Sequence, residues 1–61
     1  MTFGQEIEYV RKMRSFSVVD MCNALGLTES QYMRLIRGKH KLTIEQKIML
    51  IVATQYPFDS M

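Results

Sequence analysis

The most constraining feature of this 61-residue sequence is a helix-start signal that occurs four times. Each time, a Ser or Thr is followed three residues later by a Gln or Asp, and a stretch with apolar residues at helical spacing comes after it. In this spacing, called a capping box, the hydroxyl accepts a hydrogen bond from the N–H of the later residue, whose side chain accepts one from the N–H of the cap. The four pairs are Thr2 and Gln5, Ser17 and Asp20, Thr28 and Gln31, and Thr43 and Gln46. They predict four short helices.

Apolar spacing and helix-stop residues set the expected extent of each helix. The expected ranges are about Phe3 to Arg14, Ser17 to Leu25, Thr28 to Arg37, and Ile44 to about Gln55. Gly26 and Gly38 follow the second and third of these, where glycine adopts the positive φ of a helix exit without strain. Pro57 prevents the last helix from running further. Because no segment is typical of a strand, the sequence predicts an all-α, compact bundle of four to five short helices, in one domain over residues 1–61.

One side of each helix is expected to form the core. The positions expected to point inward are Phe3, Ile7, Val10 and either Met13 or Arg14 in the first helix, Val18, Met21, Cys22 and Leu25 in the second, Leu27 after it, and Tyr32, Leu35 and Ile36 in the third. Glu6, Glu8, Arg11 and Lys12 are expected mostly on other sides of the first helix. A chain of this length buries only about 60% of its surface on folding, which leaves no room for a second domain or a deep cleft.

The sequence offers no catalytic constellation, so an enzyme is not expected. Cys22 is the only cysteine and His40 the only histidine, and the pair lacks the spacing of a zinc site, so neither a metal nor a cofactor is expected. With no internal disulfide, Cys22 is interpreted as a small core residue, and a reducing, cytoplasmic setting is favoured. The apolar run from Ile48 to Ala53 is far shorter than the roughly 20 residues that span a bilayer, so no membrane partner is expected.

Basic residues gather between Arg34 and Lys41. Although the formal net charge of the chain is only +2, this segment holds four Lys or Arg residues and His40 but no acid. Such a cluster favours a nucleic-acid partner, and the alternative interpretation is a solvated basic edge.

The second helix, the three-residue turn around Gly26 and the third helix, at about residues 17–37, have the spacing of a helix-turn-helix. Over about residues 3–56 the chain also resembles the Cro/CI-like (XRE) family of DNA-binding regulators, in which a lead-in helix is followed by the pattern "LS..ELA..LG(V/I)S". The residues that carry this resemblance are Phe3, Gly4, Ile7 and Arg11 in the lead-in, Phe16-Ser17, Met21-Cys22, Leu25-Gly26-Leu27-Thr28, and Tyr32, Leu35, Gly38 and Lys39. It implies a lambda-repressor-like DNA-binding domain.

The resemblance further implies a sequence-specific transcriptional regulator, of the Cro-like repressor kind, whose third helix enters the major groove of double-stranded DNA. The expected base-contacting residues are Glu29, Ser30, Met33 and Arg34. Arg34 is the principal candidate, because a guanidinium matches O6 and N7 of guanine. For Glu29, the alternative is an acid that favours the first turn of its helix. The expected phosphate-contacting residues are Thr28, Arg37, Lys39, His40 and Lys41.

Two positions depart from the family pattern. Val18 stands where members often carry a DNA-contacting Gln, so no such contact is expected from it. Ile36 stands where they often carry a Glu paired with the arginine of the lead-in helix. Arg11 is therefore expected to lack its usual partner, and the junction is expected to be apolar, which the fold tolerates.

The fourth helix holds more apolar residues than a single face can bury. We therefore expect a homodimer, with the interface at Ile51, Val52, Tyr56 and Phe58. The alternative is a monomer in which this helix closes the core. Met33 is expected to point outward, and Val18 with Val19 is expected to add apolar surface near it. These residues leave open a second function, that of an adaptor which binds a protein partner, such as an antirepressor or a regulator's cofactor, instead of DNA.

Overall fold

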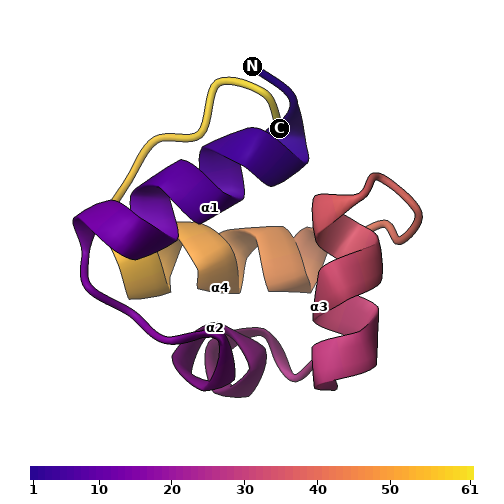
Figure 1. Ribbon diagram of the computed structural model, residues 1–61. Helices are drawn as coiled ribbons and strands as arrows, with labels where there is room; N and C mark the ends of the chain where they lie inside the picture. Colours follow the sequence, from indigo (N-terminus) through magenta and orange to yellow (C-terminus); the bar gives the residue numbers. More distant parts are fainter.

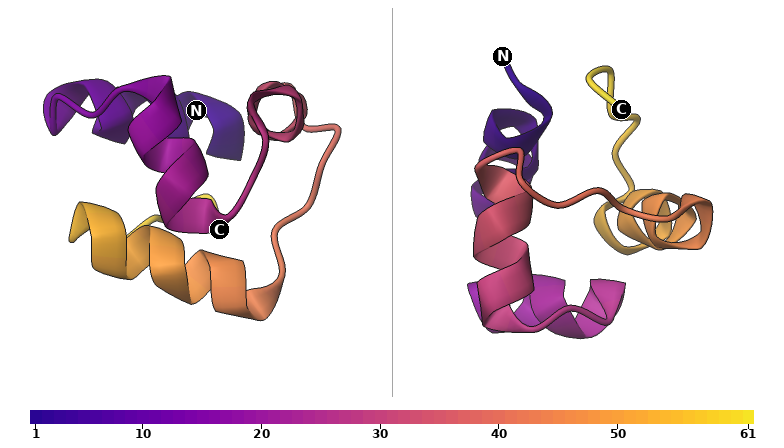
Figure 2. Two further views of the ribbon diagram at one scale, coloured as in Figure 1. Left: turned by 90° about the horizontal axis from the view of Figure 1, so that it is seen from below. Right: turned by 90° about the vertical axis from the view of Figure 1, so that its right-hand side faces the viewer.

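The computed structural model describes all residues, 1–61, and contains four α-helices and no strand. The helices are α1 (Phe3–Met13), α2 (Val18–Leu25), α3 (Glu29–Ile36) and α4 (Ile44–Thr54). α2 contacts both α3 and α4, and α1 packs against α3 (Figures 1 and 2). The molecule measures 22 × 21 × 20 Å along its principal axes. The prediction of a small all-α bundle is confirmed, and each helix begins and ends within a residue or two of the expected range.

All four capping boxes are formed. In each, the cap hydroxyl accepts a hydrogen bond of 3.0 to 3.1 Å from the N–H three residues later. The side chain of that later residue accepts a bond of 2.9 Å from the N–H of the cap. These bonds satisfy N–H groups that a helix start leaves without an intrahelical partner, which is why a pattern of adjacent residues predicts the helix starts so closely.

The helix ends are only partly as expected. Gly26 and Gly38 have φ of +68° and +78°, so the prediction that these two glycines end helices is confirmed. The exits from α1 and α4 use Ser15 and Gln55 instead, with φ of +60° and +54°. Arg14 also acts at the end of α4, because its guanidinium donates to the carbonyl oxygens of Thr54 at 2.9 Å and Gln55 at 3.2 Å.

The core forms where the four helices meet. Its nine-residue cluster consists of Ile7, Met21, Cys22, Leu25, Leu27, Tyr32, Leu35, Leu42 and Leu50. Seven of these were expected to point inward, and Val10 is buried as expected. Phe3, Val18 and Ile36 pack against its edge and are half-buried. The expectation for Met13 or Arg14 is wrong, because both are exposed on the last turn of α1 and just after it.

Glu6 is a further correction, because it is buried although it was expected on a polar side of α1. Its carboxylate accepts hydrogen bonds from the backbone N–H of Asp59 at 3.1 Å and of Ser60 at 2.9 Å. The bond from Ser60 is the main reason that the pKa of Glu6 is lowered. Glu6 thereby ties the end of the chain to α1, and the Ser60 hydroxyl also donates to the carbonyl oxygen of Met1 at 3.1 Å (Figure 1).

None of the helices combines the length and the apolar character needed to cross a membrane.

Candidate functional site

The candidate site is α3 together with the turn that precedes it. α2 ends at Gly26, whose N–H donates to the carbonyl of Cys22, and the N–H of Leu27 donates to the same oxygen at 3.0 Å. Leu27 is buried, so it anchors the turn in the core, and Thr28 then caps α3. The chain therefore changes direction within three residues, and α3 lies across α2 (Figure 2).

One side of α3 holds the helix to the core and the other is exposed. Tyr32 and Leu35 are the buried residues of the helix. All the residues expected to contact bases, Glu29, Ser30, Met33 and Arg34, are exposed. The placement required for groove contacts is therefore present, and the base-contacting role of these residues stays a prediction.

The basic segment continues from α3 into the loop that follows. Arg37, Lys39 and Lys41 are exposed, as is Thr28 at the start of the helix, and His40 is half-buried. The N–H of Lys39 donates to the carbonyl of Arg34 at 2.7 Å, which places the start of this loop beside the last turn of α3. The only ion pair of the chain joins Arg11 to Glu8, so no carboxylate neutralises the basic segment.

Arg34 lies along the outside of the helix. One of its terminal nitrogens is 3.4 Å from the carbonyl oxygen of Lys39, which directs the guanidinium toward the loop at residues 37–43, called the basic loop below. The contact is long for a hydrogen bond, and the side chain is exposed. Because so little holds it, Arg34 is free to turn to another acceptor.

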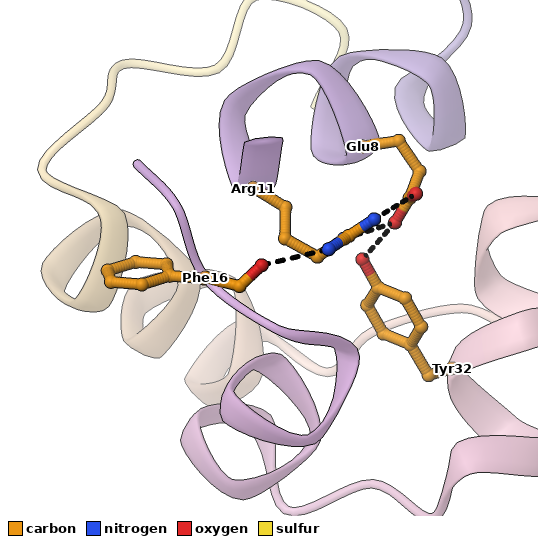
Figure 3. A network of polar contacts seen from close by, with 4 residues as sticks. All are labelled: Glu8, Arg11, Phe16 and Tyr32. Atoms are coloured by element: carbon orange, nitrogen blue, oxygen red, sulfur yellow. Dashed lines mark hydrogen bonds and ion pairs between the residues drawn. The ribbon is translucent and has the colours of Figure 1, made fainter. Parts of the chain in front are cut away.

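A polar network fixes the inner side of α3 to α1 (Figure 3). The Tyr32 hydroxyl donates to Oε2 of Glu8 at 2.6 Å. Arg11 donates to both carboxylate oxygens of Glu8 at 2.9 Å, and its Nη1 donates to the carbonyl of Phe16 at 2.8 Å. Position 36 supplies no acid, as expected, and Glu8, one turn earlier in α1, is the acidic partner of Arg11.

The network also sets the charge states of its members. The hydrogen bonds from Arg11, followed by that from Tyr32, lower the pKa of Glu8. Burial, followed by the bond to Glu8, raises the pKa of Tyr32. Glu8 is thus held as a carboxylate and Tyr32 as a neutral donor, which is the pairing that the short hydrogen bond requires.

A second contact between α1 and α3 is steric. A Cβ atom added to Gly4 would lie 2.0 Å from the carbonyl oxygen of Ile36. Only a glycine permits this approach, because such a separation is far shorter than any contact between these atoms. The position of Gly4 thus explains how the end of α3 lies against the start of α1.

The outer side of α4 carries a separate apolar face. It consists of Ile44, Ile48, Met49, Ile51 and Val52, which are between 40% and 74% exposed. Ile51 and Val52 were expected at a dimer interface, and Ile44 and Ile48 extend the same face. Tyr56 and Phe58, also expected there, are half-buried within their own chain, where the ring of Phe58 lies edge-on to Phe3 and Tyr56 at centroid distances of 6.0 and 5.2 Å.

Cys22 and the potential metal ligands of the chain form no further candidate site. The only cysteine, Cys22, is buried in the core, and burial raises the pKa of its thiol. No group of three or more His, Cys, Asp or Glu side chains is arranged to hold a metal ion.

Comparison of the chain with protein-family models, with curated proteins and with solved structures gives no match.

Proposed function

We propose that this chain is a sequence-specific DNA-binding regulator, a repressor of Cro type that inserts α3 into the major groove. The observation that carries the proposal is the division of α3 into a side fixed to the core and an exposed side that leads into a basic, acid-free segment. A helix held in this way presents side chains to base edges while neighbouring cations contact the phosphates.

Arg34 is the proposed principal base reader, and Glu29, Ser30 and Met33 extend the same exposed side. A guanidinium that donates two hydrogen bonds to guanine discriminates against other bases by about 1–3 kcal/mol. Thr28, Arg37, Lys39, His40 and Lys41 are the proposed phosphate contacts, which supply affinity but no sequence preference.

The apolar face of α4 supports a homodimer as the form that binds DNA. Its residues at positions 44, 48, 51 and 52 recur along one side of the helix, and the exposed Glu45, one turn before Met49, borders that side. A symmetric pair of such faces buries both stripes at once, and two copies of α3 would contact half-sites about 34 Å apart.

The salt dependence of DNA affinity tests the proposal. Binding of the full chain to a fluorescent random-sequence duplex should weaken by about 10³-fold between 50 and 200 mM salt if a dimer releases about 6–10 counterions. Lys39→Ala should weaken binding to all sequences alike, whereas Arg34→Ala should relax preference at one base pair of a site selected from a random pool. Absence of binding at 50 mM salt would exclude DNA as the partner.

A second candidate function is an adaptor that binds a protein. It is favoured by the exposed apolar residues near α3, because Met33 is 43% and Val19 51% exposed. Methionine and valine suit protein contacts better than base edges, apart from thymine methyl groups. For an adaptor, the affinity for random-sequence duplex is expected to be negligible at low salt.

A further inference from the structure

A cavity lies between the start of α1, the end of α3 and the start of α4. Its volume is about 350 Å³, within the range of small-ligand pockets, which starts near 300 Å³. The basic loop after α3 forms part of its wall, and Lys47 reaches it from α4. The cavity is therefore lined by residues of three helices, by the loop after α3 and by Met61, and none of the proposed base-contacting residues lines it.

The lining of this cavity has two chemical parts. Phe3, Leu35, Ile36, Leu42 and Met61 supply apolar surface. Arg37, Lys41, Lys47 and His40 supply basic groups, and no Asp or Glu side chain lines the cavity. None of these basic groups has an ion-pair partner in the chain, because the only ion pair joins Arg11 and Glu8.

An apolar lining with basic groups and no acidic side chain indicates which class of ligand fits the cavity. Three uncompensated cations around one space attract an anion through their summed charge. Lys47 is half-buried, and a charge that is partly shielded from water interacts more strongly than one on an open surface. A bare inorganic anion would leave the apolar lining in contact with water. An anion with an apolar body would cover it, and that burial would add to the affinity.

We propose that this cavity binds a small organic anion in which a phosphate or carboxylate group is joined to an apolar body of about ring size. The acidic oxygens are held by Arg37, Lys41 and Lys47, and the apolar body lies against Phe3 and Leu42. Lys47 is the residue that separates this site from the proposed DNA contacts, because it lies in α4 and belongs only to the cavity.

Titration of the ¹⁵N-labelled full chain in low salt, followed by amide chemical shifts, tests the site. Phenyl phosphate should cause saturable shifts around Gly4, Gly38 and Leu42, with a Kd on the order of 1 mM. Inorganic phosphate should bind more weakly, because it lacks the ring, and benzyl alcohol should cause no comparable shifts, because it lacks the charge. Equal affinity for phenyl phosphate and inorganic phosphate would contradict the apolar half of the proposal.

Lys47→Gln and Lys12→Gln form the matched pair of variants, since Lys12 is exposed on α1 and does not line the cavity. Lys47→Gln should weaken phenyl phosphate binding about fivefold, and Lys12→Gln should leave it unchanged. The same spectra report whether each variant is folded, and Lys41→Gln provides a second test if Lys47→Gln is not. Unsaturable shifts, or shifts spread evenly over all cationic residues, would overturn the proposal.

The cavity shares Arg37, His40 and Lys41 with the proposed phosphate contacts, so phenyl phosphate should also compete with DNA. This consequence rests on the proposed function, and Lys47→Gln should bind DNA normally yet be less sensitive to the competitor. Failure of the chain to bind DNA would leave the titration without DNA unaffected, so the two proposals fail by different measurements.

Discussion

At the scale of single residues, Gly4 sits where α1 and α3 approach most closely. In an unobstructed helix, replacement of glycine by alanine stabilises the fold by about 0.5–1 kcal/mol. Here the new methyl group would meet the backbone of Ile36 at 2.0 Å, and backbone cannot move aside as a flexible side chain can. Gly4→Ala is therefore expected to destabilise the chain by about 2 kcal/mol or more in urea unfolding. A gain in stability would show that the two helices are not in this contact.

At Ser15 the opposite replacement, of serine by glycine, is expected to stabilise the fold, because a φ of +60° is a conformation that favours glycine. Ser15→Gly should stabilise the fold by about 0.5–1 kcal/mol, once the greater freedom of glycine in the unfolded chain is subtracted. Ser30→Gly is the matched control, since Ser30 lies within α3 and glycine there should destabilise by about 0.5 kcal/mol. Thermal unfolding of the two variants should shift in opposite directions.

At the scale of helices, the hydrogen bond from Tyr32 to Glu8 anchors α3 to α1. Tyr32→Phe keeps the buried ring and removes only the donor, so it should cost about 1–2 kcal/mol at pH 7. The pKa of Glu8 is lowered in the folded chain, so the stability that the carboxylate contributes is present above its ordinary pKa of 4.5 and is lost as the pH falls through the folded value. The difference between wild type and Tyr32→Phe should therefore be smaller at pH 3 than at pH 7. A difference that is independent of pH would exclude the ionised carboxylate as the acceptor.

The helix starts were predictable from the sequence because each capping box joins residues only three apart. The contacts that hold the helices together were not, since they join residues far apart along the chain. Glu6 binds Ser60, Glu8 binds Tyr32, and Arg14 binds the end of α4. Spacing within α1 does not identify these partners, and it placed both Glu6 and Arg14 on the wrong side.

The candidate site likewise has a part that local spacing predicted and a part that it did not. The 3.6-residue period of α3 predicted which residues are exposed, and this is where Arg34 and Met33 lie. The cavity beside α3 was not predicted, because it depends on how Phe3, Arg37 and Lys47 converge from three helices. Its local signals were the basic cluster that ends at Lys41 and Lys47, a basic residue within an apolar helix.

At the scale of the whole molecule, the apolar face of α4 is the surface on which the proposed homodimer depends. Ile48 lies in the middle of this face and is exposed, so the fold does not depend on it, whereas a dimer formed through the face would bury it. Ile48→Glu is expected to shift the mass in sedimentation equilibrium from dimer to monomer, because two carboxylates would be brought together across a symmetric interface. It should also weaken DNA binding, since a single copy of α3 makes half of the contacts. Met13→Glu, which changes an exposed apolar residue of α1, should alter neither property, and a wild-type chain that sediments as a monomer at every concentration would contradict the dimer.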